Sequence, residues 1–137
     1  MTTPRGIRNN NPLNIRKGNN WQGERLKQKD PSFEEFDSMV MGVRAGFVLL
    51  RNYMRGTKMH PKPCINIAQI IRRWAPPSEN ATARYINSVS KRSGLNAYEV
   101  LTFSEKKKMC ALVDAMIWVE CGQSIDLAII ESAYDLV

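Results

Sequence analysis

A lone glutamate follows an apolar helical run near the end of the chain. Residues 112–124 read LVDAMIWVECGQS, and the apolar residues before Glu120 recur every three or four positions. One more step of that spacing places Glu120 on the core-facing side of the helix, and Gly122 then allows the helix to end. Burial and the negative end of the helix dipole both favour the protonated form of a carboxyl. Such a group suits general acid catalysis, for example protonation of a glycosidic oxygen, whereas an early helix end or pairing with an arginine would make it structural.

The elements that would position this carboxyl are mainly helices. The apolar spacing after residue 38 matches helices rather than strands over most of the chain. We expect a helix capped by Ser38, a helix from Asn66 to the proline pair 76–77, a helix over 78–93, a short helical turn from Asn96, a long helix from Ser104 to Glu120, and a helix over 124–135.

A short antiparallel hairpin is expected ahead of these helices. The segments WQGERL (21–26) and SFEEF (32–36) flank the turn-like KQKDP. The first twenty residues are rich in Asn, Arg, Gly and Pro, and we expect an irregular segment ordered by asparagine hydrogen bonds to the backbone. The predicted fold class is therefore mainly α with a small β-hairpin lobe, in one domain over residues 1–137.

Three stretches resemble lysozyme-like enzymes and lytic transglycosylases of phages and bacteria. AMIWVECG (115–122) resembles the helix of these enzymes that ends in VESGG with the catalytic glutamate, although Cys121 and Gln123 replace the serine and the second glycine. RNNNPLNIR, followed by WQGE and FEEFDSMVMGVRA, resembles a block that precedes their hairpin and is also similar to a block of bacterial glucosaminidases. RRWAPPSENATARYINSV is similar to a segment that carries a tyrosine into their sugar groove.

The order of these stretches differs from the family pattern. Lysozyme-like enzymes place the glutamate helix before the hairpin block, whereas here the glutamate comes last. We therefore expect a circularly permuted lysozyme-like arrangement, which folds tolerate because chain ends often lie close together. Without permutation, Glu79 is the rival acid, although a glutamate at a helix start ordinarily stabilises the helix.

The resemblance implies a sugar-binding groove with further residues. Glu24 would be a second carboxylate that positions water or stabilises an oxocarbenium-like transition state, or else an exposed strand residue. Asn11 and Asn14 would bind N-acetyl groups or hydroxyls, or else shape the loop. Trp21, Trp74 and Tyr85 would offer flat apolar faces to pyranose rings, or else pack in the core, which the helical spacing of Trp74 favours.

The charge and the cysteine and histidine content limit the classes of binding partner and cofactor that we expect. The formal net charge of +7 suits an anionic partner, and the basic residues read as dispersed, with EKKK at 105–108 the densest run. Three cysteines without C-x-x-C spacing indicate buried hydrophobes in a reduced protein, and a single histidine disfavours a metal site, so we expect no metal or cofactor. No apolar window is long enough for a membrane span, and the N-terminus lacks the apolar centre of a signal peptide. We therefore expect synthesis in the cytoplasm and action on the wall after release, non-classical export or delivery in a phage particle.

The favoured function is cleavage of the β-1,4 glycan of peptidoglycan, as a muramidase, glucosaminidase or lytic transglycosylase with Glu120 as the acid. The lack of an obvious second acid favours a transglycosylase or a weak enzyme. One alternative is a non-catalytic phage virion or wall-binding protein with a lysozyme-like fold. A basic nucleic-acid-binding helical domain is less favoured, because no helix-turn-helix with a clustered recognition face is evident.

Overall fold

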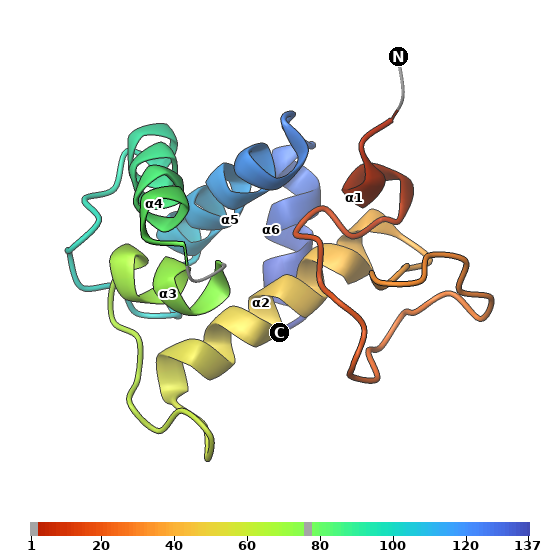
Figure 1. Cartoon of the computed structure of the whole chain (residues 1–137), viewed down its shortest axis with the longest axis horizontal. Helices are drawn as coiled ribbons and strands as arrows, with labels where there is room; N and C mark the ends of the chain where they lie inside the picture. Colours follow the sequence, from red (N-terminus) through yellow and green to blue (C-terminus); the bar gives the residue numbers. More distant parts are fainter. Residues whose placement is uncertain (1–2, 76–77) are drawn as a thin grey trace.

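The chain folds into a helical domain preceded by an irregular segment. The computed structural model describes residues 3–75 and 78–137. Its helices are α1 (Arg5–Arg8), α2 (Met39–Arg55), α3 (Ile67–Trp74), α4 (Glu79–Ser93), α5 (Lys106–Cys121) and α6 (Leu127–Asp135). Figure 1 shows α5 between α4 and α6, with α2 crossing below them and the segment before α2 on the right. None of the helices in the described ranges is both long enough and apolar enough to cross a membrane.

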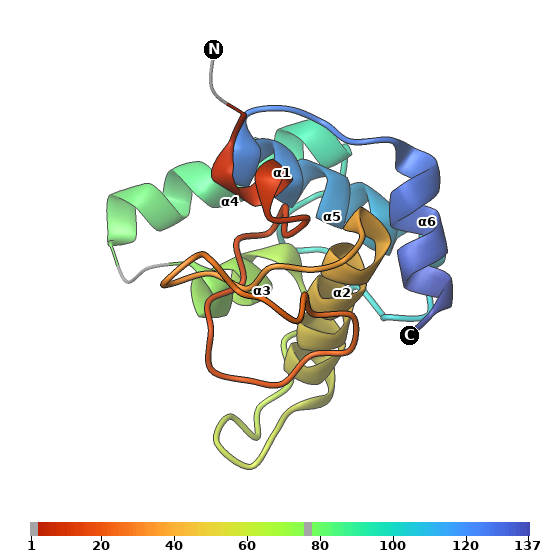
Figure 2. The ribbon, with the colours of Figure 1, turned by 90° about the vertical axis from the view of Figure 1, so that its right-hand side faces the viewer.

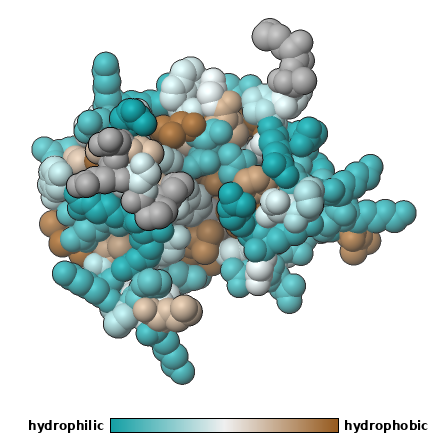
Figure 3. Space-filling model, viewed as in Figure 1, coloured by the Kyte–Doolittle hydropathy of each residue, from teal (hydrophilic) through white to brown (hydrophobic). Residues whose placement is uncertain are grey.

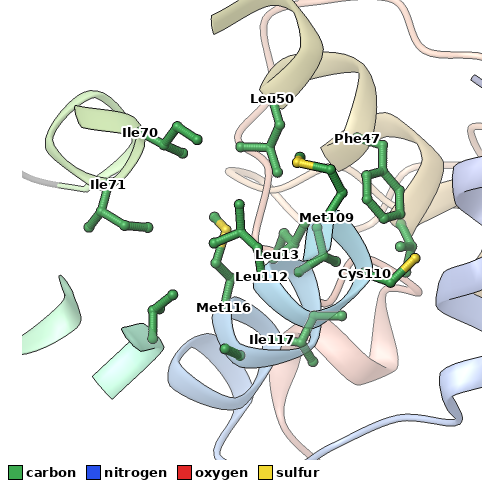
Figure 4. Close-up of a cluster of buried hydrophobic side chains, with 14 of the residues drawn as sticks. Leu13, Phe47, Leu50, Ile70, Ile71, Met109, Cys110, Leu112, Met116 and Ile117 are labelled. Atoms are coloured by element: carbon green, nitrogen blue, oxygen red, sulfur yellow. The ribbon is translucent and has the colours of Figure 1, made fainter. Parts of the chain in front are cut away.

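The core is built around α5. This helix contacts α1, α4 and α6, and α2 contacts α3 and α6. The predicted stripe on α5 is confirmed, because every member is fully buried: Met109, Leu112, Val113, Met116 and Ile117. Figure 4 shows this stripe facing side chains from α2 and α3. The i, i+3, i+4 spacing thus fixes which face of α5 turns inward and where Glu120 must emerge.

Most of the predicted helix ends are confirmed. The side chains of Ser38 and Asn66 accept hydrogen bonds from the backbone N–H of Met41 and Gln69, as N-caps do. Gly94 and Gly122 adopt the left-handed conformation that ends α4 and α5. The proline pair 76–77 lies outside the described residues.

Two local predictions at helix starts are wrong. Glu105, and not Ser104, occupies the N-cap position of α5. Its carboxylate accepts from the backbone N–H and the hydroxyl of Thr102, so the turn ahead of the helix is closed by a longer side chain than expected. The helical turn expected from Asn96 is a non-helical turn, in which the Asn96 and Glu99 side chains accept hydrogen bonds from the backbone N–H groups of Tyr98 and Asn96.

The predicted β-hairpin lobe is also wrong. The described residues contain no strand. The two segments form one isolated bridge, Glu24 with Phe36, and Arg16 ahead of them forms another with Phe33. The N–H of Arg25 donates to the C=O of Glu35, but the pairing does not extend into a ladder. Side chains occupy the backbone positions that a ladder would use: the Gln28 amide binds both the N–H and the C=O of Glu35. The expected lysozyme-like architecture with a hairpin lobe, permuted or not, is therefore corrected to a helical fold with an irregular N-terminal segment.

Asparagines and a buried aspartate order this N-terminal segment. Asn11 is fully buried, accepts from the N–H of Ile15, and donates to the C=O groups of Ile15 and Glu34. The buried Asp30 accepts from Arg5 and Asn9 and from two backbone N–H groups of the following turn. These bonds replace a ladder, and the segment packs against α2 and the end of α5 (Figure 2).

Candidate active site

The last turn of α5 carries Glu120 to the asparagine-rich segment. The Asn14 amide donates to one oxygen of the Glu120 carboxylate over 3.0 Å, and the Tyr85 hydroxyl donates to the other over 2.9 Å. Glu120 is half-buried. Three parts of the chain therefore meet at one carboxyl: the N-terminal segment, α4 and α5.

A cleft of about 590 Å³ opens beside this carboxyl. Its lining includes Glu120 and Asn14, the rings of Trp21, Phe33, Tyr53 and Trp74, and the polar side chains of Arg16 and Asn19. In Figure 3 the surface is hollowed between the helices on the left and the N-terminal segment on the right. Among the described residues that line the cleft, Glu120 is the sole carboxylate. The cleft thus combines one acid with aromatic walls, as a site for a neutral, ring-shaped substrate would.

The backbone around Asn14 is shaped to present its amide. Asn14 has a φ of +53°, in the left-handed region that asparagine tolerates better than most residues. Close packing holds the segment there: the Cys121 thiol contacts the C=O of Pro12 at 3.1 Å. A Cβ on Gly6 would lie within 2.9 Å of both the Asn14 side-chain oxygen and the Cys121 sulfur. Gly6 is therefore required for the approach of α1 to the site.

Tyr85 serves Glu120 as a hydrogen-bond donor. Burial, and then the negative charge of Glu120, raise the pKa of Tyr85 far above its ordinary value of 10. The phenol therefore stays protonated at any pH at which the protein would work, and its O–H remains available to the carboxylate. This contact differs from the sugar-facing ring that the resemblance implied for Tyr85.

The thiol next to the acid is unreactive. Burial, together with the charge of Glu120, raises the pKa of Cys121 to about 11. Cys64, Cys110 and Cys121 are all free. In the described part of the chain, no group of three His, Cys, Asp or Glu side chains is placed to hold a metal ion.

The structure brings some of the sequence candidates together and separates others. Glu120, Asn14 and Trp21 line the cleft. Tyr85 is not part of the lining, but its hydroxyl donates a hydrogen bond to Glu120. Asn11 does not reach the cleft, because its amide is used up by backbone groups inside the loop. It acts as the loop-holding residue that was the alternative interpretation.

Glu24 lies away from the cleft lining. One of its oxygens accepts from the backbone N–H of Trp21, and its carboxylate faces the buried Glu34. Burial, and then the hydrogen bond and charge of Glu24, raise the pKa of Glu34 to about 7, against the smaller effect of Lys17. The two glutamates thus form a carboxyl pair behind the Trp21 wall of the cleft. Glu79 begins α4, and its side chain lies outside the described residues.

Sequence reasoning missed several residues of the cleft. Tyr53 and Trp74 pack edge-to-face at 6.2 Å between ring centroids, and both line the cleft. The helical spacing of Trp74 favours the core over a sugar-facing position, yet the ring lines the cleft. Tyr53 stands beside the core spacing of α2, so no pattern pointed to it. Arg16 and Asn19 follow the asparagine block directly, and their closeness to Asn14 is the signal that could have found them.

A protein of a bacteriophage is similar to this chain. No family model matches the chain. Protein P5 of Pseudoalteromonas phage PM2 is 40% identical over 124 residues, which cover 88% of this chain and 72% of that protein. A phage relative agrees with the expectation of a phage-associated protein. At this identity and coverage, the chain belongs to the family of protein P5 of Pseudoalteromonas phage PM2.

Proposed function

We propose that the cleft cleaves the glycan strands of peptidoglycan, with Glu120 as the general acid. The observation that carries the proposal is a single carboxyl, held by Asn14 and Tyr85, in a cleft walled by aromatic rings. Aromatic rings pack against the apolar faces of pyranose rings. The polar groups at the edges of Trp and Tyr rings can hydrogen-bond the sugar hydroxyls. The resemblance of the segment ending at Glu120 to the acid helix of lytic transglycosylases supports the same assignment.

The reaction favoured here is an intramolecular transglycosylation. Glu120 gives its proton to the glycosidic oxygen as the bond from that oxygen to C1 breaks. The C6 hydroxyl of the same sugar then bonds to C1, and its proton returns to Glu120, which leaves a 1,6-anhydro end and a restored acid. This route needs one carboxyl, whereas the hydrolytic routes use a pair. Glu24 lies outside the cleft lining and faces Glu34, which supports the single-acid route.

Asn14 and Tyr85 are positioning residues in this mechanism. Each donates one hydrogen bond to Glu120, so they fix the plane of the carboxyl relative to the cleft. Each carboxylate oxygen keeps a second lone pair that can hold the transferred proton. Because both oxygens are anchored, a substrate bound along the aromatic walls meets an acid of fixed direction.

The test is glycan release from purified sacculi by Glu120→Gln and by the unchanged protein. Removal of a general acid lowers such rates by about 10²–10⁴-fold, so E120Q should release almost no soluble fragments. Glu131→Gln is the matched control, because Glu131 is an exposed glutamate on α6, remote from the cleft lining. Mass spectrometry of the products separates anhydro ends from reducing ends, and reducing ends alone would exclude the intramolecular route. Equal release by E120Q and the unchanged protein would refute Glu120 as the acid.

The phage relative favours one second candidate, a non-catalytic component of a phage particle that binds the wall. This candidate keeps the cleft as a binding groove. It predicts that the unchanged protein and E120Q both bind sacculi and that neither releases fragments. The release assay therefore decides between the two candidates.

A further inference from the structure

The net charge of the chain is concentrated in one segment. Residues 38–78 contain seven Lys and Arg and no Asp or Glu, so this segment carries +7, which is the formal net charge of the whole chain. The remaining residues hold 13 basic and 13 acidic side chains. The Lys and Arg residues are spread along the sequence with few consecutive runs. The net charge is nevertheless uneven, because Asp and Glu are absent from residues 38–78.

Six of these seven cations belong to one surface, which we call the basic lobe. It consists of the end of α2, the connecting loop and α3, over residues 51–73. Its cations are Arg51, Arg55, Lys58, Lys62, Arg72 and Arg73. The loop projects at the bottom of Figure 1, and hydrophilic side chains project at the same place in Figure 3.

The loop of the basic lobe is ordered by hydrogen bonds. The N–H of Cys64 donates to the C=O of Tyr53, and the Gln69 side chain accepts from the N–H of Ile65. Beside these contacts lies a pocket of about 490 Å³, lined in part by His60, Lys62, Arg72 and Arg73. A fixed loop therefore presents several cations around one hollow.

These cations have no counter-charge among the described residues. Every ion pair of the described chain lies outside the basic lobe. Arg73 donates through one terminal nitrogen to the C=O of Lys62, while its other terminal nitrogen is buried without a hydrogen-bond partner. Unpaired cations around a hollow attract anionic groups, and guanidinium groups bind carboxylates and phosphates in bidentate geometry.

The basic lobe shares a wall with the cleft. The Arg73 guanidinium lies 5.6 Å from the centre of the Tyr53 ring, and Tyr53 packs against Trp74. Tyr53 and Trp74 line the cleft, whereas Arg73 lines the basic pocket. A polymer bound in the cleft would therefore have its side groups next to the cations.

We propose that the basic lobe binds the carboxylates of the stem peptides that branch from a glycan strand in the cleft. Peptidoglycan joins a sugar chain without net charge to peptides that carry carboxylates, and the protein joins an aromatic cleft to an adjoining cationic lobe. Nucleic acid is less suited, because its charge lies on the backbone itself and would fall in the aromatic cleft rather than beside it. This inference rests on the proposed function in so far as a glycan strand occupies the cleft.

The test measures binding to purified sacculi in the E120Q background, so that cleavage does not interfere. The lobe variant is Lys58→Gln, Lys62→Gln and Arg72→Gln, and the matched control is Lys27→Gln, Lys91→Gln and Lys107→Gln. All six side chains are exposed, and none takes part in an ion pair of the described residues. Both variants remove three charges, so they differ only in where the charges stood.

The lobe variant should bind sacculi about tenfold more weakly, and the control should change less than about threefold. On a neutral oligomer of β-1,4-linked N-acetylglucosamine, which carries neither peptides nor carboxylates, the lobe variant and its parent should bind equally. Equal weakening by both variants, or weakening that persists without peptides, would overturn the inference. So would tighter binding of the parent to duplex DNA or to anionic lipid vesicles, lost in the lobe variant. Failure of the unchanged protein to release fragments refutes the proposed function but leaves a peptide-dependent binding result intact, so the two failures are distinguishable.

Discussion

Glu34→Gln should make the protein more stable at alkaline pH. Glu34 is 4% exposed, and its pKa of about 7 results first from burial and then from the facing Glu24. An unfolded glutamate loses its proton near pH 4.5, whereas the folded protein keeps it until about pH 7. Between these values the folded state binds more protons, so this group's contribution to stability falls as the pH rises through the window and is constant above it.

The size of the effect follows from the same difference in pKa. A shift from 4.5 to about 7 corresponds to at most about 3 kcal/mol, at about 1.4 kcal/mol for each pH unit. Screening by solvent reduces the expected difference to about 1–2 kcal/mol. Glutamine is neutral at every pH and can donate its amide to Glu24, so E34Q avoids the cost of a second negative charge.

The assay is urea denaturation of E34Q and the unchanged protein from pH 4 to pH 8. The difference in unfolding free energy should be near zero at pH 4, grow through pH 5–7, and stay level above. Glu35→Gln is the control with the opposite sign: backbone N–H bonds from Asp30 and Lys29 and the charge of Arg25 lower the pKa of Glu35, although burial opposes them. The stability that ionised Glu35 contributes is complete above the ordinary glutamate pKa of 4.5 and is lost as the pH falls through that range. E35Q should therefore be less stable than the unchanged protein by a constant amount above about pH 5, and the deficit should shrink toward pH 4. A pH-independent difference for E34Q would refute the raised pKa of Glu34.

Three further predictions concern the frame of the site. Gly6→Ala should cost about 1–3 kcal/mol in urea denaturation and weaken wall binding or glycan release, because the new Cβ would press on Asn14. Asn66→Ala should cost about 1 kcal/mol of unfolding free energy through loss of the α3 cap, with Asn66→Asp close to neutral. Asp30→Asn should flatten the acid limb of a stability profile, because the bonds from Arg5 hold the pKa of Asp30 well below its usual range, and the stability from the ionised form is lost as pH falls.

The helical part of the fold could be predicted from the sequence because each helix carries its own signals. Ser38 and Asn66 cap helices with short polar side chains, and Gly94 and Gly122 end them, so local chemistry alone fixes these boundaries. The apolar stripe of α5 fixed the orientation of Glu120 in the same way. A local pattern is sufficient wherever the backbone hydrogen bonds close within one segment.

The N-terminal segment could not be predicted in this way because its hydrogen bonds are not local backbone bonds. Alternating residues beside a turn favour a hairpin. Here, however, the side-chain amide of Gln28 bonds the backbone N–H and C=O of Glu35, and that of Asn11 bonds the backbone N–H and C=O of Ile15. Asn and Gln side chains compete with a neighbouring strand for the backbone N–H and C=O groups. The residue types alone do not determine whether the side chains or the strand bind those groups. The partner of Asn14, Glu120, stands 106 positions away, so no local pattern could place their contact.

The loss of the hairpin leaves the proposed site intact, for a physical reason. A β-ladder would orient every second side chain toward the same face. The cleft depends on the orientation of only two side chains from this segment: the Asn14 amide, which faces Glu120, and the Trp21 ring, which lines the cleft. The left-handed backbone at Asn14 fixes the first direction, and the bond from the Trp21 N–H to Glu24 anchors the second. Because Glu24 faces the buried Glu34, the anchor of Trp21 lies in a carboxyl pair whose members repel each other once Glu34 loses its proton. The cleft wall should therefore loosen at alkaline pH before the helical core does, and hydrogen exchange of the Trp21 amide should speed up there while amides of α5 stay protected.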